Sequence, residues 1–478
     1  MDHPLTGLAM LTLGRISLEN GNYDQATDWL QEAALSAFYY ERAEVIEEAF
    51  QLLFLAQISS GRGGIPPTLS AATAWAKQKK YEEMYASLLA KTAEAYAVGG
   101  NLELASSTLS LVRRAIGRSD MAKARIGAEI NYVGSVIAYM QGDVKDGYQS
   151  LQAAIEFERK GSVRLFHIKL VDSEYVRGAI RDRGAMKIYE QVLDDPVAIV
   201  WRQQPLEALS QLLVPQPLAL NHWFYAALKR EKPLVALNIV DRMKRARFYS
   251  QLPLGGRLLN LCWIMQGPLS TLSQEAQLQR REFSAQFPTF EKLVQQADNI
   301  REKLKDNPLL SEDPDLAKTQ KSLLTRLAKN SKLQNDELLK MAVRREPVAM
   351  IFPPLRDVEK MQQNLGAGEA VLVFHTTKKA HHVFLLTQER HRHWKIVSPN
   401  NVLEHLKTLY RLMGHHDSNR ALDLDHFADK SWQEASKKLA QEITSGAKVD
   451  LGQDIKELVI VPDHFYWYVP FEALWVGP

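Results

Sequence analysis

Four glycines at nearly equal intervals constrain the fold of this chain more than any other feature of its sequence. Gly21, Gly61, Gly100 and Gly142 follow one another at spacings of 40, 39 and 42 residues, and each lies in a polar turn between two stretches of helical period. Such a repeat predicts a helical solenoid, because each helix pair has an apolar face that only a neighbouring pair can bury.

The first unit resembles the tetratricopeptide repeat. Small residues at Gly14, Ala26 and Ala33 allow two helices to come close, and Tyr23 and Leu30 fill the space between them. The resemblance implies an array that binds a protein partner. Because the usual period of that family is about 34 residues, a spacing of about 40 implies longer helices or longer turns. Further units are predicted at 87–116 and 128–157, around Gly184 and around Ala236.

The pattern changes after Gly255 and Gly256. Residues 269–346 are rich in Gln, Glu, Lys, Arg and Leu and predict long helices interrupted at Pro288 and at the turn 311–315. We expect them to form a hairpin. A solvated connecting hairpin is favoured over a functional surface, because mixed charge is typical of a solvated helix face.

From residue 347 the pattern predicts an α/β domain. The final apolar run, Leu458–Val461, predicts a strand buried on both faces of a parallel sheet. Without neighbours on both sides, this strand would expose an edge that invites pairing with another chain. The other predicted elements are strands at 348–352, 370–377, 381–387 and 393–398, and helices at 402–413 and 431–444.

The last strand and turn resemble the CHAT domain, a caspase-related peptidase domain found after tetratricopeptide arrays. The match lies in the strand Val459–Val461, the turn Pro462-Asp463, and the segments Val469-Pro470-Phe471 and Ala473-Leu474. The run from Gly368 to Thr387 is similar to the start of that domain. Relatives of this architecture include separase-like peptidases and the partners of bacterial type III CRISPR effectors.

The resemblance implies a helical-repeat (tetratricopeptide-like) array at 1–250, a helical connecting region at 251–346, and the N-terminal part of a partial α/β caspase-like domain at 347–478. It also implies that the general-base His and the nucleophilic Cys lie on later strands, so no catalytic residue is assigned to this chain. His464 stands where the family has Gly, which places the turn type in doubt because His adopts positive φ only at a cost.

Composition excludes several classes of function. The chain has one cysteine, Cys262, so it forms no intramolecular disulfide and no cysteine-based metal site. The net charge is +3, which does not demand a polyanionic partner. No signal peptide or membrane-spanning run is recognised, and a cytoplasmic protein without cofactor or metal is expected.

Three groups of residues are candidates for a catalytic or metal-binding site. Cys262 lies in an apolar segment and is interpreted as a core residue rather than a nucleophile. His464 is interpreted as a turn residue, because no nucleophile accompanies it. The clustered histidines are interpreted as surface residues rather than metal ligands; they are His375, His381, His382, His391, His393, His415 and His416.

A basic run follows the last predicted repeat and consists of Arg242, Lys244, Arg245 and Arg247. Together with Arg257 it is compatible with a contact to RNA, phosphate or an acidic partner. It is equally typical of a helix C-terminus, where cations offset the macrodipole. Aromatic residues are limited here to Phe248 and Tyr249, so the helix end is favoured and nucleic acid is not the expected partner.

Two hypotheses of function remain. The chain is the protein-binding N-terminal portion of a CHAT-family cysteine peptidase and is inactive alone, or it is a complete non-catalytic adaptor. Both predict that the 478 residues by themselves hydrolyse no peptide bond. The partners expected are a protein bound by the repeats and, in the first hypothesis, the remaining C-terminal CHAT segment.

Overall fold

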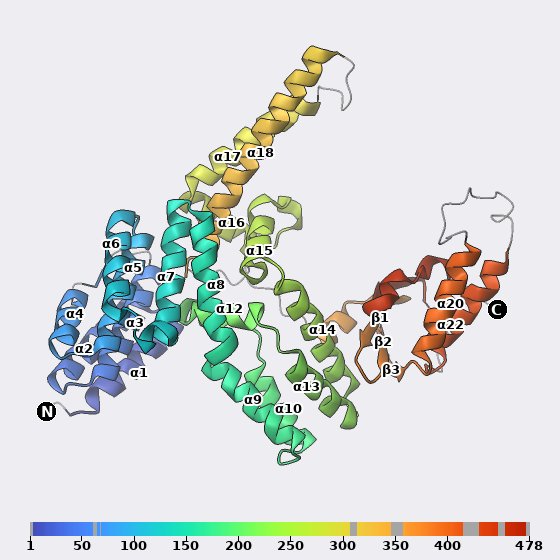
Figure 1. Ribbon diagram of the computed structural model, residues 1–478, viewed down its shortest axis with the longest axis horizontal. Helices are drawn as coiled ribbons and strands as arrows, with labels where there is room; N and C mark the ends of the chain where they lie inside the picture. Colours follow the sequence, from blue (N-terminus) through green and yellow to red (C-terminus); the bar gives the residue numbers. More distant parts are fainter. Residues whose placement is uncertain are drawn as a thin grey trace. The chain divides into compact units, whose positions relative to one another are not determined.

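A computed structural model of the chain describes residues 3–60, 65–66, 68–305, 313–345, 357–413, 430–447 and 455–474. The fold is mostly helical, with a small mixed sheet near the C-terminus (Figure 1). The chain divides into two compact units, each assembled from three separate segments. The first comprises Met1–Leu170, Val192–Pro215 and Ala246–Pro354; the second comprises Val171–Gln191, Gln216–Arg245 and Leu355–Pro478.

The first unit begins with a stack of helices. Contacts join α1 to α2 and α2 to α3. Further along the chain they join α4 to α5, α5 to α6, α6 to α7 and α7 to α8. The odd-numbered helices α1, α3, α5 and α7 also contact one another in order, so they form one layer of the stack. The bounds are α1 (Thr6–Glu19), α2 (Tyr23–Tyr39), α3 (Ala43–Ser59), α4 (Leu69–Gln78), α5 (Glu82–Val98), α6 (Leu102–Ile116), α7 (Arg125–Gln141) and α8 (Val144–Gly161).

Three of the four turn glycines have a backbone conformation that favours glycine. Gly21, Gly100 and Gly142 have φ of 78°, 83° and 83°, the left-handed region that a side chain adopts only at a cost. The close helix contact predicted at Gly14 is present, since a Cβ there would lie 2.6 Å from the side chain of Leu30. Gly61 lies outside the described residues.

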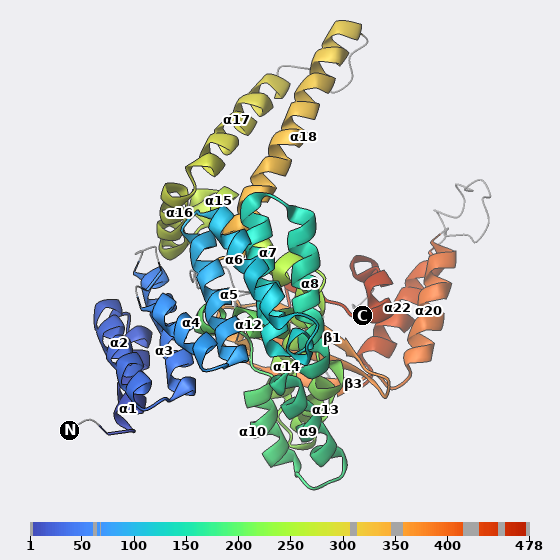
Figure 2. The ribbon, with the colours of Figure 1, turned by 60° about the vertical axis from the view of Figure 1, so that its left-hand side comes forward.

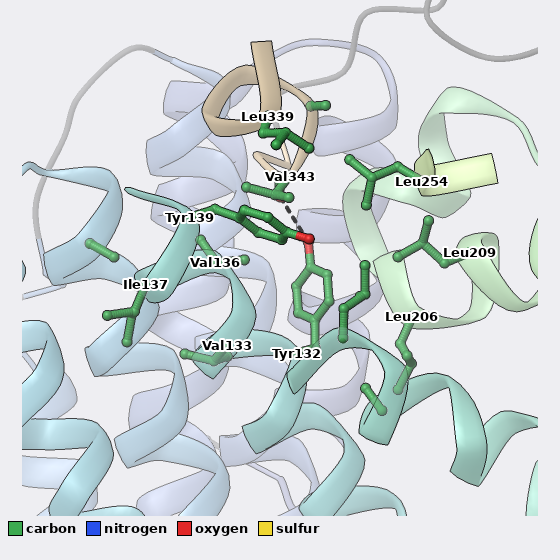
Figure 3. Packing of buried hydrophobic residues seen from close by; sticks show 14 of the residues in the cluster. Tyr132, Val133, Val136, Ile137, Tyr139, Leu206, Leu209, Leu254, Leu339 and Val343 are labelled. Atoms are coloured by element: carbon green, nitrogen blue, oxygen red, sulfur yellow. Dashed lines mark hydrogen bonds between the residues drawn. The ribbon is translucent and has the colours of Figure 1, made fainter. Parts of the chain in front are cut away.

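Further helices complete the first unit. The long helices predicted for the connecting region are present: α16 ends just before Pro288, which begins α17, and α17 packs side by side with α18 (Figure 2). Ring and aliphatic side chains of α7, α12 and α18 meet in one core (Figure 3). The bounds are α11 (Ala198–Gln203), α12 (Pro205–Leu213), α15 (Arg257–Gln266), α16 (Gln274–Gln286), α17 (Pro288–Lys305) and α18 (Pro314–Ala342), while α9 (Val163–Val176) passes from the first unit to the second.

The second unit is built around a sheet of order β3-β2-β1-β4, in which β1 is antiparallel to β2 and parallel to β4. Side chains of α20 and α22 cover one face of the sheet, and Phe224 of α13 packs on the other. The strands are β1 (Glu369–Thr376), β2 (His381–Thr387), β3 (His391–Lys395) and β4 (Glu457–Val461). The helices are α10 (Asp182–Val192), α13 (Pro217–Lys229), α14 (Pro233–Tyr249), α19 (Val358–Gln363), α20 (Pro399–Leu412) and α22 (Ser431–Thr444).

One prediction about the sheet is wrong. β4 is not buried on both faces: it lies at one edge of the sheet in the part of the chain that the structure describes, and Val459 is 50% exposed. A short apolar run has the same letters at an edge as in the middle of a sheet, so the pattern does not distinguish the two places. The strand predicted at 348–352 lies outside the described residues.

Candidate functional site at the carboxyl edge of the sheet

The parallel pairing of β1 and β4 places the ends of both strands at the same edge of the sheet. Thr376 ends β1, and the turn Pro462-Asp463 follows β4. In α/β folds, ligands bind outside the carboxyl ends of parallel strands. This edge is therefore the part of the second unit where a site is expected.

Asp463 is the central residue of this edge and is 4% exposed. Its Oδ2 accepts a hydrogen bond from the backbone N–H of Thr376 at 2.8 Å and lies 3.9 Å from Nδ1 of His375. Its Oδ1 lies 3.9 Å from Nζ of Lys244, and that ammonium donates to the carbonyl of Pro462 at 2.9 Å. A buried carboxylate is tolerated only with such partners. Asp463 thus fastens the turn to β1 and to helix α14.

His464 follows in the left-handed conformation, with φ of 54°. The turn therefore keeps the positive φ that a glycine would supply, although a residue with a Cβ adopts it at a cost of about 1–2 kcal/mol. Beside it, Nδ1 of His381 lies 2.9 Å from the hydroxyl of Tyr466. Burial, together with the neighbouring His464, lowers the pKa of His381, and burial raises the pKa of Tyr466.

Two further histidines, the buried His382 and the half-buried His393, form a pair on the face covered by α13. Nδ1 of His382 lies 3.0 Å from Nε2 of His393, and the two rings are stacked. Burial and the neighbouring ring lower the pKa of His382 to about 3, and burial with the nearby Lys395 lowers that of His393 to about 4. Both rings are therefore neutral at pH 7, and one donates to the other.

The prediction of surface histidines is wrong for His375 and His382, which are 2% and 0% exposed. They occupy paired positions of β1 and β2 and both contact the ring of Phe224. It is correct for His391, which is exposed on β3. His415 and His416 lie outside the described residues. Among the residues that the structure describes, no three His, Cys, Asp or Glu side chains are placed to hold a metal ion.

Three residues of the basic run, Arg242, Lys244 and Arg245, have contacts within the second unit. Arg242 lies over the ring of Trp223, at 5.4 Å from its centroid, and Nε of Arg245 donates to Asp241 at 2.7 Å. Lys244 reaches the Pro462-Asp463 turn, and Arg247 lies in the last turn of α14. Helix α14 therefore supplies the cation for the turn after β4, a role that the sequence pattern did not indicate.

Cys262 belongs to the first unit, on α15. Its side chain is half-buried against the core rather than fully inside it, and Sγ lies 3.5 Å from Oε1 of Gln266. Burial raises the pKa of the thiol, which lowers the fraction of reactive thiolate at neutral pH.

A second concentration of polar contacts, which sequence reasoning missed, is the socket of Arg345. Its Nη2 lies 2.9 Å from Oε2 of Glu94 on α5, and its Nε donates to the other oxygen of that carboxylate. Its Nη1 donates to the backbone carbonyls of Arg202 and Gln203. Although burial alone would lower the pKa of Arg345, the Glu94 carboxylate raises it. Rings from the helices on either side of α5 flank the guanidinium; they belong to Phe54 of α3 and Tyr132 of α7.

The backbone just before Arg345 is held equally firmly. The carbonyl of Ala342 accepts from Nε of Arg257 at 3.1 Å, and that of Val343 accepts from the hydroxyl of Tyr132 at 3.0 Å (Figure 3). The carbonyl of Arg344 accepts from Nε1 of Trp201 at 2.8 Å. Ala342 is the last residue of α18, and the carbonyls at a helix C-terminus lack helical partners, so these contacts supply one there and continue along the next two residues. Residues 342–345 therefore pack against the layer formed by α3, α5 and α7.

Arg257 is fully buried in this arrangement, with its guanidinium 3.8 Å from the centroid of the Trp201 ring. Burial lowers its pKa to about 9. Arg257 is therefore not a contact for RNA or phosphate, because a side chain at 0% exposure cannot reach a ligand at the surface.

Comparisons of the chain with protein-family models, with curated proteins and with solved structures give no match. Within the described residues, none of the helices is long and apolar enough to cross a membrane.

Proposed function

We propose that this chain is the protein-binding N-terminal portion of a CHAT-family, caspase-related cysteine peptidase and that it is inactive alone. The stack of helix pairs recognises the partner. The sheet module supplies the first strands of the peptidase fold, and the remaining CHAT segment supplies the general base and the nucleophile. The proposal rests on the motif resemblance around Pro462-Asp463.

The observation that carries the proposal is the construction of the turn after β4. A parallel strand pair, a buried aspartate at its carboxyl edge and a left-handed residue directly after it provide a rigid strand-end platform. Chemistry at such an edge requires a thiolate and an imidazole within hydrogen-bond reach of each other. The chain's single thiol, Cys262, belongs to the other unit and has a raised pKa.

The test is a peptidase assay on the 478-residue chain with a fluorogenic peptide library, before and after alkylation with iodoacetamide. We expect no alkylation-sensitive hydrolysis, and no difference between the wild type and Cys262→Ala. Hydrolysis that alkylation removes and that Cys262→Ala lacks would make Cys262 the nucleophile and refute the proposal.

A complete non-catalytic adaptor is the second candidate. It is supported by the Arg345 socket, which joins residues near the end of α18 to α3, α5 and α7 and so stabilises the helical stack as a binding scaffold. The candidates differ in whether the natural reading frame continues past Pro478 into strands bearing a His and a Cys. Sequencing that reading frame separates them.

A further inference from the structure

Helix α18 carries a row of positive charge on one face. Between residues 316 and 335 it has five cations and no acidic residue. At 100° per residue all five fall within an arc of about 140°, and they extend over about 21 Å of helix. They are Lys318, Lys321, Arg326, Lys329 and Lys332, and each of them is exposed. We call these five residues the basic face.

Contacts on the opposite side of α18 fix the direction of the basic face. Gln334 donates to the carbonyl of Leu293 at 3.2 Å, and Asn330 donates to Gln296 at 3.3 Å, both on α17. Leu323 is also buried. Because this side packs on α17, the five cations lie on the solvent-exposed side of α18.

No cation of the basic face forms an ion pair with a described residue. Some cations elsewhere on the same hairpin are paired: Lys340 contacts Glu337 at 2.6 Å, and Arg301 contacts Asp298 at 2.7 Å. Like charges three residues apart on a helix repel by a few tenths of a kcal/mol each. The net charge of the whole chain is +3, so this concentration of positive charge is local rather than a property of the composition.

A groove between α17 and α18 extends the basic face to one side. Arg326 and Lys329 lie on both, and Lys303 adds a third cation. The same groove is lined by the side-chain amides of Gln296 and Asn299. Cations interleaved with amide donors are the groups that contact phosphate oxygens in nucleic-acid complexes.

We propose that the basic face binds the sugar–phosphate backbone of a double-stranded nucleic acid, without reading its sequence. Complementary charge favours a polyanion with regularly spaced phosphates. The groove has no aromatic lining, and the one aromatic residue of the two helices, Phe290, is 1% exposed. Single strands are bound largely by stacking of bases on aromatic rings, so the hairpin is suited to a duplex. This inference is independent of the function proposed for the sheet module.

The test is binding of a fluorescein-labelled 24-base-pair duplex to the full chain, followed by anisotropy between 50 and 200 mM salt. Five phosphate contacts predict a slope of about −4.5 for log K against log salt, or roughly a 500-fold loss of affinity over that range. The variant Lys318→Gln/Lys321→Gln/Lys329→Gln is expected to reduce the slope by about three and to bind at least 10-fold more weakly at 50 mM salt. These side chains are exposed, so the melting temperature of the triple variant is expected to stay close to that of the wild type.

The matched control removes three exposed lysines elsewhere, by Lys123→Gln/Lys145→Gln/Lys187→Gln. It is expected to bind the duplex like the wild type. Equal losses in the two triple variants would mean that only net charge matters and would overturn the proposal. So would the absence of binding at 50 mM salt, or tighter binding of a single strand of the same length. Binding of a glutamate-rich peptide in place of the duplex would assign the basic face to an acidic protein instead.

Discussion

The contact between Glu94 and Arg345 illustrates how a few residues stabilise the first unit. Both side chains are buried, at 2% and 12% exposure, and the carboxylate meets the guanidinium through two donors. We expect Glu94→Gln to lower the free energy of unfolding by about 3–5 kcal/mol, because it leaves a buried guanidinium without its counter-charge. Urea unfolding followed by circular dichroism measures the change.

The control for this prediction is Glu48→Gln, which breaks the exposed pair with Arg15 and is expected to cost less than about 1 kcal/mol. The double variant Glu94→Gln/Arg345→Met removes both charges and is expected to recover part of the loss. A cost of Glu94→Gln no larger than that of Glu48→Gln would show that the socket contributes little.

The pair of His382 and His393 makes stability depend on pH. Both have folded-state pKa values, of about 3 and about 4, below the unfolded value of 6.5. Between these values the unfolded state binds more protons, so the free energy of unfolding falls as the pH is lowered. The expected loss between pH 7 and pH 5 is on the order of 2 kcal/mol for each ring, or about 4 kcal/mol for the pair.

Unfolding of the wild type at several pH values measures this loss. His393→Gln is expected to flatten the dependence, and His391→Gln, which changes an exposed residue of the same strand, is expected to leave it unchanged. An equal pH dependence in all three proteins would show that the pair does not cause the acid sensitivity.

Neither this pair nor the Lys244–Asp463 contact was predictable from sequence. A residue's partner is decided by the tertiary fold, whereas the local pattern reports only period and composition.

At the scale of elements, the turn glycines and the alternation of helices were predictable because they depend on local backbone geometry. We expect Gly142→Ala to lower the free energy of unfolding by about 1–2 kcal/mol, since φ of 83° is unfavourable for any residue with a Cβ. Gly161→Ala, at the end of α8, is the control. Its nearest contact is an ordinary 3.4 Å, so its cost is expected to be near zero or negative.

Calorimetry of the two variants tests this difference. Equal melting temperatures would show that the turn tolerates a side chain. The edge position of β4 was not predictable at the same scale. The position of a strand in a sheet depends on which strands lie beside it, and the sequence of Leu458–Val461 shows only that the segment is apolar.

At the scale of the whole molecule, the two units are interleaved along the chain. Phe224 and Lys244, from the helical array, complete the packing of β2 and of the turn after β4. A fragment of residues 347–478 lacks α13 and α14, so we expect it to expose the face carrying His375, His382 and Phe384. Strong binding of the dye ANS and poor dispersion of amide NMR signals are expected. A well-dispersed spectrum without dye binding would show that the sheet module folds alone.

The Arg345 socket also bears on the order of events during synthesis. Glu94 leaves the ribosome 251 residues before the arginine that neutralises it. At about 5–20 residues per second, that interval lasts roughly 12–50 s. Throughout it, Glu94 on α5 lacks the arginine that contacts it in the folded chain. Chaperones that shield nascent chains have that window in which to bind, and it closes only when translation has passed Arg345.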